Sequence, residues 1–254
     1  IRQFGVPVHH KFKGQENSLS AMKAHDVRRR GRYLSAVDLK PWRQGQPSET
    51  GLYYTKLGLG SPPKDYYVQV DTEVTSYGLI CVDCVTCPRT SDLGIELTLY
   101  DPKVSKTSDL VSCAEDFCSD TYDGPIAGCK PDVVCPYSVT YGDGSSTTGY
   151  FVKDYLTFNQ VNGNLHSSPA NSTVIFGCGA KQSGALGSTN EALMEYLVLV
   201  KQIRLCFHNL LHSRKVKKIF SHCLDNIHGG GIFALGEVVE PKVNTTPLVS
   251  GQYV

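Results

Sequence analysis

The sequence predicts an all-β fold, and two observations support that prediction. Gly (24 residues) and Tyr (14 residues) are abundant in the 254-residue chain, and clusters of Gly, Pro, Ser and Asp interrupt its apolar runs at short intervals. Runs rich in Tyr, Val, Ile and Phe that are bounded by such clusters are typical of strands. The length suffices for one large or two modest domains with cores of their own. No apolar run approaches the roughly 18 residues that a membrane-spanning helix needs.

The first predicted hairpin leads into an acidic residue. Residues 51–60 predict a strand, residues 61–65 contain Ser-Pro-Pro and predict a turn, and residues 66–70 predict the return strand. Asp71 and Thr72 follow directly. A strand therefore delivers one carboxylate to a loop, which is where rigid scaffolds place functional groups.

Residues 1–50 differ from the rest of the chain in charge. Through residue 49 the sequence has ten basic and four acidic side chains (net +6), whereas the remainder has 15 basic and 20 acidic side chains (net −5). The densest basic cluster, residues 28–32, has the composition of a solvated face or a nucleic-acid patch. The opposite charge of the body supports an intramolecular partner for this cluster at least as well. We expect a basic leader that is separable from the body, with an amphipathic helix over residues 17–39.

Cysteines are concentrated in one segment, because seven of the ten lie between Cys81 and Cys135. This density, together with acceptor sequons for N-glycosylation at Asn171 and Asn244, favours the secretory route and disulfides. The segment shows little apolar periodicity, so it needs crosslinks to hold its shape. The Cys-x-x-Cys-x-x-Cys run that starts at Cys81 is also typical of an iron–sulfur or zinc site. Its fourth ligand is at neither standard spacing, and we expect no metal and no cofactor.

Further strands are predicted downstream of the cysteine-rich segment. Residues 137–152 predict a hairpin with a mobile, glycine-rich tip, and residues 174–179 predict a buried strand. Residues 229–236 predict the arm of another hairpin. The stretch 193–218 has the pattern of a basic amphipathic helix, of the kind that binds calmodulin or a membrane surface.

Asp71 and the 137–152 hairpin are candidates for two parts that an acid peptidase requires. Two carboxylates that share one proton activate a water molecule, and a cover excludes bulk solvent. Taken together, several motifs resemble those of the pepsin-like aspartic endopeptidases, and specifically the plant nepenthesin-like branch. They are Gly51-Leu52-Tyr53-Tyr54, Gly58-Leu59-Gly60-Ser61-Pro62-Pro63, Tyr67-Val68-Gln69-Val70-Asp71-Thr72, Tyr141-Gly142-Asp143-Gly144-Ser145, Phe176-Gly177-Cys178-Gly179, Phe220-Ser221-His222-Cys223-Leu224 and the cysteines of the insert.

The resemblance implies a role for each matching residue. Asp71 would be the first catalytic acid, supported by Thr72, and the substrate-binding flap would consist of Tyr141, Gly142, Asp143 and Gly144. Residues 1–50 would be the propeptide and linker of a zymogen, residues 51–224 the N-terminal peptidase lobe with insert 81–135, and residues 225–254 the start of a C-terminal lobe. The implied disulfides are Cys81 with Cys84, Cys87 with Cys178, Cys113 with Cys135, and Cys118 with Cys129.

Two windows depart from the family pattern. The family follows its first Asp-Thr with Gly-Ser and, further on, a Trp, whereas this chain has Glu73 and Val74 and, at the Trp position, Gly78. With one nucleotide restored, suitable codons for residues 73–80 spell Gly-Ser-Asp-Ile-Leu-Trp-Val-Asn, which is the family motif. The same operation on residues 194–201 yields Asp-Gly-Ile-Leu-Gly-Phe-Gly-Gln, the loop that braces the active-site strand in this family. We interpret residues 73–80 and 194–212 as compensated frame slips, which makes the helical pattern of 193–218 an accident.

The resemblance predicts an aspartic endopeptidase that acts on polypeptides at acid pH. The chain has no second Asp-Thr-Gly or Asp-Ser-Gly, so the second acid is expected from a C-terminal lobe, and the chain as printed is expected to be inactive and truncated. We expect an extracellular or vacuolar monomer whose partners are substrates and its own propeptide. Nucleic acid is not an expected partner, and membrane association is expected only through a lipid anchor at the missing C-terminus. The alternative is a catalytically inactive homologue that acts as a binding or inhibitor protein.

Overall fold

A computed structural model of the chain describes residues 3–10, 53–71, 78–90, 97–161, 167–187, 196–198, 220–224 and 231–235. The helix expected over residues 17–39 lies outside the described residues, as do Thr72, Glu73 and Asn244. The described part consists mainly of strands, which confirms the predicted all-β class. None of its helices has the length and apolar composition needed to cross a membrane.

Eleven strands of the described part form one sheet. They are β1 (Gln3–His10), β2 (Tyr53–Leu59), β3 (Lys64–Asp71), β4 (Gly78–Ile80), β5 (Asp109–Leu110), β6 (Pro136–Thr140), β7 (Ser146–Val161), β8 (Ser167–Ser183), β9 (Tyr196–Val198), β10 (Phe220–Leu224) and β11 (Gly231–Leu235). A short helix, α2 (Asp116–Thr121), and a 3-10 turn, η3 (Gly184–Gly187), complete the described elements.

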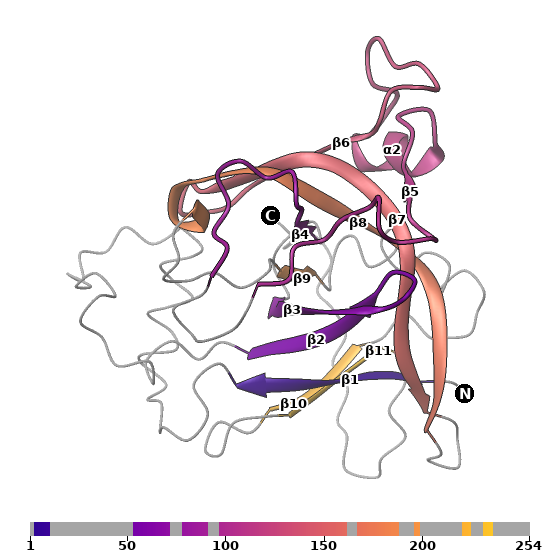
Figure 1. Cartoon of the computed structure of the whole chain (residues 1–254), viewed down its shortest axis with the longest axis vertical. Helices are drawn as coiled ribbons and strands as arrows, with labels where there is room; N and C mark the ends of the chain where they lie inside the picture. Colours follow the sequence, from indigo (N-terminus) through magenta and orange to yellow (C-terminus); the bar gives the residue numbers. More distant parts are fainter. Residues whose placement is uncertain are drawn as a thin grey trace, which may run out of the picture.

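The sheet follows the order β10-β11-β1-β2-β7-β8-β4, with β3 paired to β2 and β9, and with β5 and β6 paired to β7 (Figure 1). Strand β1 comes from the basic leader, and it pairs antiparallel with β11, β2 and β7. The first residues of the leader therefore share a backbone hydrogen-bond ladder with the body of the protein.

The predicted hairpin that leads to Asp71 is present. Strands β2 and β3 pair antiparallel from Tyr54 opposite Gln69 to Leu59 opposite Lys64. The turn begins at Gly60, whose φ of +90° favours glycine. A 2.9 Å ion pair between Lys56 and Asp65 joins the two strands on the exposed side.

The main core lies against the long antiparallel ribbon of β7 and β8, which curves over the molecule (Figure 1). Because side chains alternate along a strand, the even-numbered residues of β7 from Val152 to Phe158 face inward, and all four are buried. They meet the buried face of β8 and an aromatic cluster in which the Tyr100 and Phe176 rings lie 4.9 Å apart, edge to face. Tyr66 of β3 joins this core, because its ring lies 5.8 Å from that of Tyr100.

A second core covers the opposite face of the same ribbon. Phe151 lies between Phe117 of α2 and Tyr137 of β6, at ring distances of 4.9 and 5.3 Å. Val111, Val139 and three insert cysteines are also buried in this cluster, and a fourth cysteine, Cys129, is partly buried and packs against it. The cysteine-rich insert thus has a small core of its own, which adheres to the outside of β7.

Candidate active site

Asp71 is the last residue of β3, so the strand extends one residue beyond the predicted end at Val70. Two short strands, β9 and β4, contribute parallel pairings near this end of the chain segment. Strand β9 pairs parallel with β3 and places Val198 opposite Asp71. Strand β4, which begins seven residues later, pairs parallel with β8 and places Gly78 opposite Gly177. Pairing with other strands therefore fixes both β3, which ends at Asp71, and β4, which follows it in the chain. Strand β9 lies within residues 194–212, one of the two windows that depart from the family pattern.

The hairpin of β6 and β7 ends in a tightly hydrogen-bonded tip. The Tyr141 N–H donates to the Ser145 carbonyl at 2.8 Å, and the Gly144 N–H donates to the Tyr141 carbonyl at 3.0 Å. The Asp143 Oδ1 accepts from both the backbone N–H (2.8 Å) and the hydroxyl (2.6 Å) of Ser145. This is an Asx turn, in which the Asp side chain replaces a backbone acceptor. Asp143 therefore fixes the shape of the proposed flap.

The tip also rests on a residue that the sequence analysis missed. Gly184, the first residue of η3, has a φ of +68°, and a Cβ there would lie 2.9 Å from the Cα of Ser145. A side chain at this position would push the tip away. The available signal was the Gly-x-x-Gly spacing directly after the buried strand.

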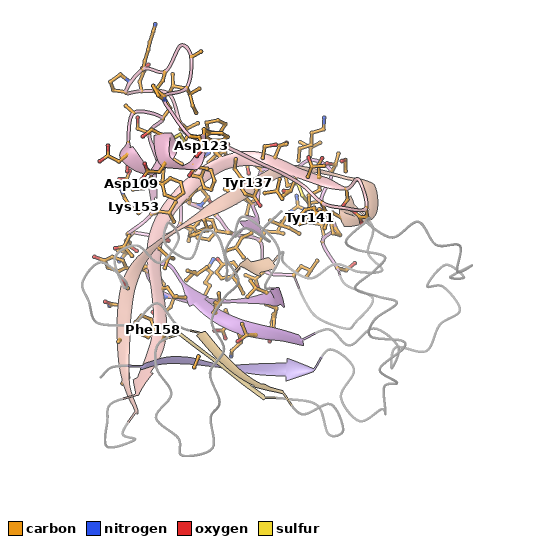
Figure 2. The ribbon with its side chains drawn as sticks, turned by 180° about the vertical axis from the view of Figure 1, so that it is seen from behind. Asp109, Asp123, Tyr137, Tyr141, Lys153 and Phe158 are labelled. Carbon is orange, nitrogen blue, oxygen red and sulfur yellow. A yellow bond between two sulfur atoms is a disulfide. The ribbon has the colours of Figure 1, made fainter. Side chains whose placement is uncertain are left out.

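Tyr141 lies at the tip end of the hairpin, away from α2 (Figure 2). It is partly buried and packs against the hydrophobic cluster of the insert. Phe176-Gly177-Cys178-Gly179 lies directly beneath the hairpin, since a Cβ on Gly177 would occupy the space of the Tyr137 ring. This close packing gives the Phe-Gly-Cys-Gly motif a structural reason.

The eight expected cysteines all form disulfides, but the expected pairing is wrong. The structure joins Cys81 to Cys178, Cys84 to Cys87, Cys113 to Cys129, and Cys118 to Cys135, with Cα separations of 5.5 to 5.8 Å. The first bond ties the end of β4 to β8, so it closes the segment that leads away from the Asp71 loop. A side-chain cluster of Cys81, Asp83 and Cys178 has the spacing of a metal site, but its two sulfur atoms are bonded to each other.

The sheet geometry explains the correction. Ser112 lies opposite Val134 in an antiparallel bridge, so Cys113 and Cys135 are diagonal neighbours rather than opposite ones. Helix α2 instead brings Cys118 to Cys135. At the first site, β4 pairs with β8, so Cys81, which directly follows β4, lies near Cys178 on β8 at a Cα separation of 5.5 Å.

Asp154 is a buried acid that the sequence analysis did not single out. Its side chain is 0% exposed and accepts hydrogen bonds from the Tyr100 hydroxyl (2.7 Å), the Thr107 hydroxyl (2.6 Å) and the Tyr155 N–H (2.7 Å). Its sequence position held a clue, because Asp154 occupies an inward-facing place between Val152 and Leu156. The carboxyl group joins β7 to residues 100–107, so its role is structural.

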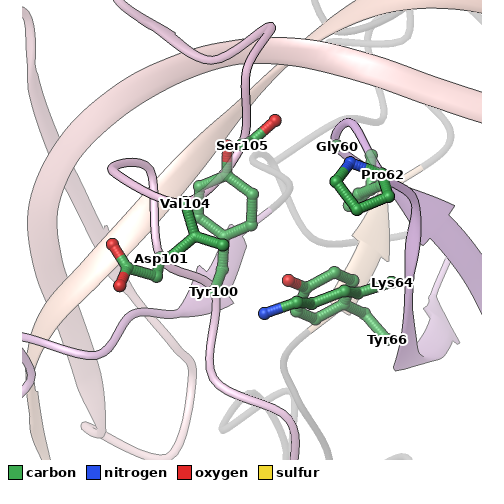
Figure 3. A pocket seen from close by; sticks show the side chains of 9 residues that line it. Gly60, Pro62, Lys64, Tyr66, Tyr100, Asp101, Val104 and Ser105 are labelled. Atoms are coloured by element: carbon green, nitrogen blue, oxygen red, sulfur yellow. The ribbon is translucent and has the colours of Figure 1, made fainter.

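A small pocket lies where the β2–β3 turn meets the segment after Tyr100 (Figure 3). Lys64 and Tyr66 form one side, and Tyr100, Asp101 and Val104 form the other. Its volume of about 10 Å³ leaves room for about one water molecule. Neither Asp71 nor Tyr141 lines it, so it is not a candidate site for a peptide substrate.

Comparison with known proteins agrees with these features. The family model described as xylanase inhibitor N-terminal matches residues 53–237. Aspartic proteinase 36 of Arabidopsis thaliana is 47% identical over 249 residues, which cover 98% of this chain and 51% of the relative. The chain belongs to the plant pepsin-like aspartic protease family. Aspartic proteinase 39 of the same plant is 41% identical and is matched over 52% of its length, so the chain spans about half the length of these relatives.

Solved structures confirm the fold of this aspartic protease family member. Conglutin gamma, a basic 7S globulin from lupine seeds, superposes with a TM-score of 0.55 at 16% identity, over 94% of this chain and 50% of the globulin. At that identity the likeness concerns the fold alone.

Proposed function

We propose that this chain contributes the first catalytic acid, Asp71, to an aspartic endopeptidase that hydrolyses polypeptides at acid pH. The observation that carries the proposal is the position of Asp71 at the end of β3, next to the parallel strand β9. The names of relatives that align over 98% of the chain support the reaction class. Disulfides and plant relatives of this kind are also consistent with an extracellular or vacuolar location.

The proposed chemistry uses two carboxylates that share one proton, because two like charges at that range do not both ionise. The ionised carboxyl group takes a proton from a water molecule, and the water oxygen attacks the peptide carbonyl carbon. The protonated carboxyl group supplies its proton to the substrate, the C–N bond breaks, and an amine and a carboxylic acid leave. Asp71 is one member of the pair, and a C-terminal lobe supplies the other.

The hairpin tip is the proposed cover of this site. Tyr141, Gly142, Asp143 and Gly144 would close over the bound peptide and exclude bulk water. The hydrogen bonds of Asp143 to Ser145 support this role, because they keep the tip in one shape before substrate arrives. Thr72, next to Asp71, is proposed to support the acid pair.

Residues 1–50 are proposed to be the propeptide of a zymogen. The leader carries +6 and the remainder −5, so the two attract at neutral pH and separate when carboxylates of the body are protonated. Processing of the full-length gene product should therefore accelerate as pH falls. Processing at one rate from pH 7 to pH 4 would refute this regulation.

The two unusual windows are proposed to be compensated frame slips. The placement of residues 196–198 beside β3 supports this, because the restored frame has Ile-Leu-Gly in those positions. Sequencing of genomic and transcript DNA across residues 73–80 and 194–212 tests the idea. Repeated recovery of codons that encode the given residues would exclude a sequencing error.

The reaction class is tested with the full-length gene product and a denatured protein as substrate. Cleavage should occur at acid pH, fall toward neutral pH and stop with a pepstatin-type inhibitor. A full-length protein that folds but cleaves nothing under these conditions would instead be an inactive binding homologue. The names of the aligned relatives favour the peptidase.

A further inference from the structure

The outward face of the β7–β8 ribbon is only partly covered by the insert. The insert packs over Phe151, and the Lys153 ammonium still reaches Asp109 (3.6 Å) and Glu115 (3.5 Å) at the edge of the insert. Figure 2 shows Lys153 and Asp109 at this boundary. Two residues further along β7, on the same face, the side chain of Tyr155 is 41% exposed.

A glycosylation sequon lies on that open face. Asn171 pairs with Thr157, and Thr173, the hydroxyl residue of the sequon, pairs with Tyr155. Asn171 is exposed, as an acceptor for a bulky glycan must be. Asn171 and Tyr155 are diagonal neighbours on one face of an antiparallel ladder, about 7–8 Å apart at the backbone and within reach of an aromatic side chain.

We propose that Asn171 carries an N-linked glycan whose first sugar packs against the ring of Tyr155. The donor is an oligosaccharide on a lipid pyrophosphate, supplied by the secretory pathway. The Asn171 Nδ2 forms a bond to C1 of the first sugar, the bond from C1 to the phosphate oxygen breaks, the lipid pyrophosphate leaves, and the amide loses one proton. The product is a neutral glycosyl amide on the outer face of β8.

The ladder makes this contact specific. Both residues lie on regular strands that are hydrogen-bonded to each other, so the backbones of Tyr155 and Asn171 are held at a fixed spacing. The C–H face of a sugar is apolar and covers an aromatic ring, which removes apolar area from water. The exposed Tyr155 ring thereby gains a cover that the insert does not provide.

Occupancy is tested on the full chain secreted from a eukaryotic cell, with tryptic peptides analysed by mass before and after complete deglycosylation. We expect a glycan at Asn171 in the parent chain and in Thr173→Ser, which keeps the sequon. The variant Thr173→Ala, which destroys the sequon and keeps Asn171, should carry none. An unmodified Asn171 in the secreted parent chain would overturn the proposal. This test needs no peptidase activity, so its failure leaves the proposed function untouched.

The contact with Tyr155 is tested by hydroxyl-radical oxidation followed by mass spectrometry. Tyr122, in the insert, is the matched control because its exposed fraction of 40% is close to the 41% of Tyr155. Tyr155 should be protected relative to Tyr122 both in the intact glycoprotein and after trimming to one sugar. Protection should disappear after complete removal and in Thr173→Ala. Equal oxidation of the two tyrosines in the glycosylated protein would refute the contact.

Discussion

The Tyr100 hydroxyl donates a 2.7 Å hydrogen bond to Oδ2 of Asp154, and both side chains are buried, at 1% and 0% exposure. The Thr107 hydroxyl and the Tyr155 N–H donate hydrogen bonds to the other carboxylate oxygen, Oδ1. The pair holds residues 100–107 against β7 and thereby supports the aromatic core above β3. The buried carboxyl group of Asp154 is thus a structural element of this part of the protein.

Replacing Asp154 should destabilise the chain strongly. Asp154→Ala leaves three donors without an acceptor, and each buried unsatisfied group costs about 1–3 kcal/mol, so a loss of about 3 kcal/mol or more is expected. Asp154→Asn should cost less because its amide oxygen still accepts. Urea unfolding of the oxidised chain measures both, with exposed Asp109→Ala as the control, for which a change within about 0.5 kcal/mol is expected. Equal effects of Asp154→Ala and Asp109→Ala would contradict this role.

Alkaline pH should also destabilise the fold. Burial is the main cause that raises the pKa of Tyr66 to about 12, and burial with the nearby Asp83 raises that of Tyr150 to about 12. An unfolded tyrosine has a pKa of about 10, so both groups contribute stability that is complete below about pH 10 and is lost as pH rises toward about 12. Urea midpoints should fall between pH 9 and 11, and less steeply in Tyr66→Phe. A flat profile in the parent chain would count against buried tyrosines.

The strand framework could be predicted because its cues are local. Period-two patterns and the Gly-Ser-Pro-Pro turn fix the β2–β3 hairpin, and the motif around Asp71 fixes its place at a strand end. Contacts between residues far apart in the sequence could not be derived from such local cues. The partner of Cys81 depends on which strand lies beside β4, and the role of Asp154 depends on donors 47 and 54 residues away.

The hairpin tip could be predicted in part for the same reason. Tyr141 to Ser145 form a recognisable glycine-rich tip between two strand-like runs. The support from Gly184 is not visible in that local pattern, because it arises only when the ends of β7 and β8 meet. Sequence therefore located the parts of the candidate site better than the contacts that hold them.

The four disulfides should be found with the pairing of the structure. Non-reducing peptide mapping should link Cys118 to Cys135 and Cys113 to Cys129. Because the Cys118–Cys135 bond spans 17 residues, Cys118→Ala with Cys135→Ala should cost about 2–5 kcal/mol. Recovery of Cys113 linked to Cys135 would contradict the position of α2, which places Cys118 next to Cys135.

The hydrogen bonds of Asp143 should matter for activity more than for folding. In the full-length gene product, Asp143→Ala should lower kcat/KM by about tenfold or more, because a displaced flap misplaces the substrate. Asp143→Asn keeps the acceptor oxygen and should retain most of the activity, and neither variant should change the unfolding midpoint much. If the Asn variant were as impaired as the Ala variant, the charge of Asp143 rather than its turn would be responsible.

The central claim is that Asp71 is one of the two catalytic acids. The direct measurement is the rate of peptide hydrolysis at acid pH by the full-length gene product and its Asp71→Asn variant, with Asp109→Asn as a surface control. We expect Asp71→Asn to lose about 10²- to 10⁴-fold in kcat, the usual contribution of a general acid or base, while its folding is unchanged. Asp109→Asn should match the parent enzyme. A folded Asp71→Asn variant with the parent rate would contradict the account.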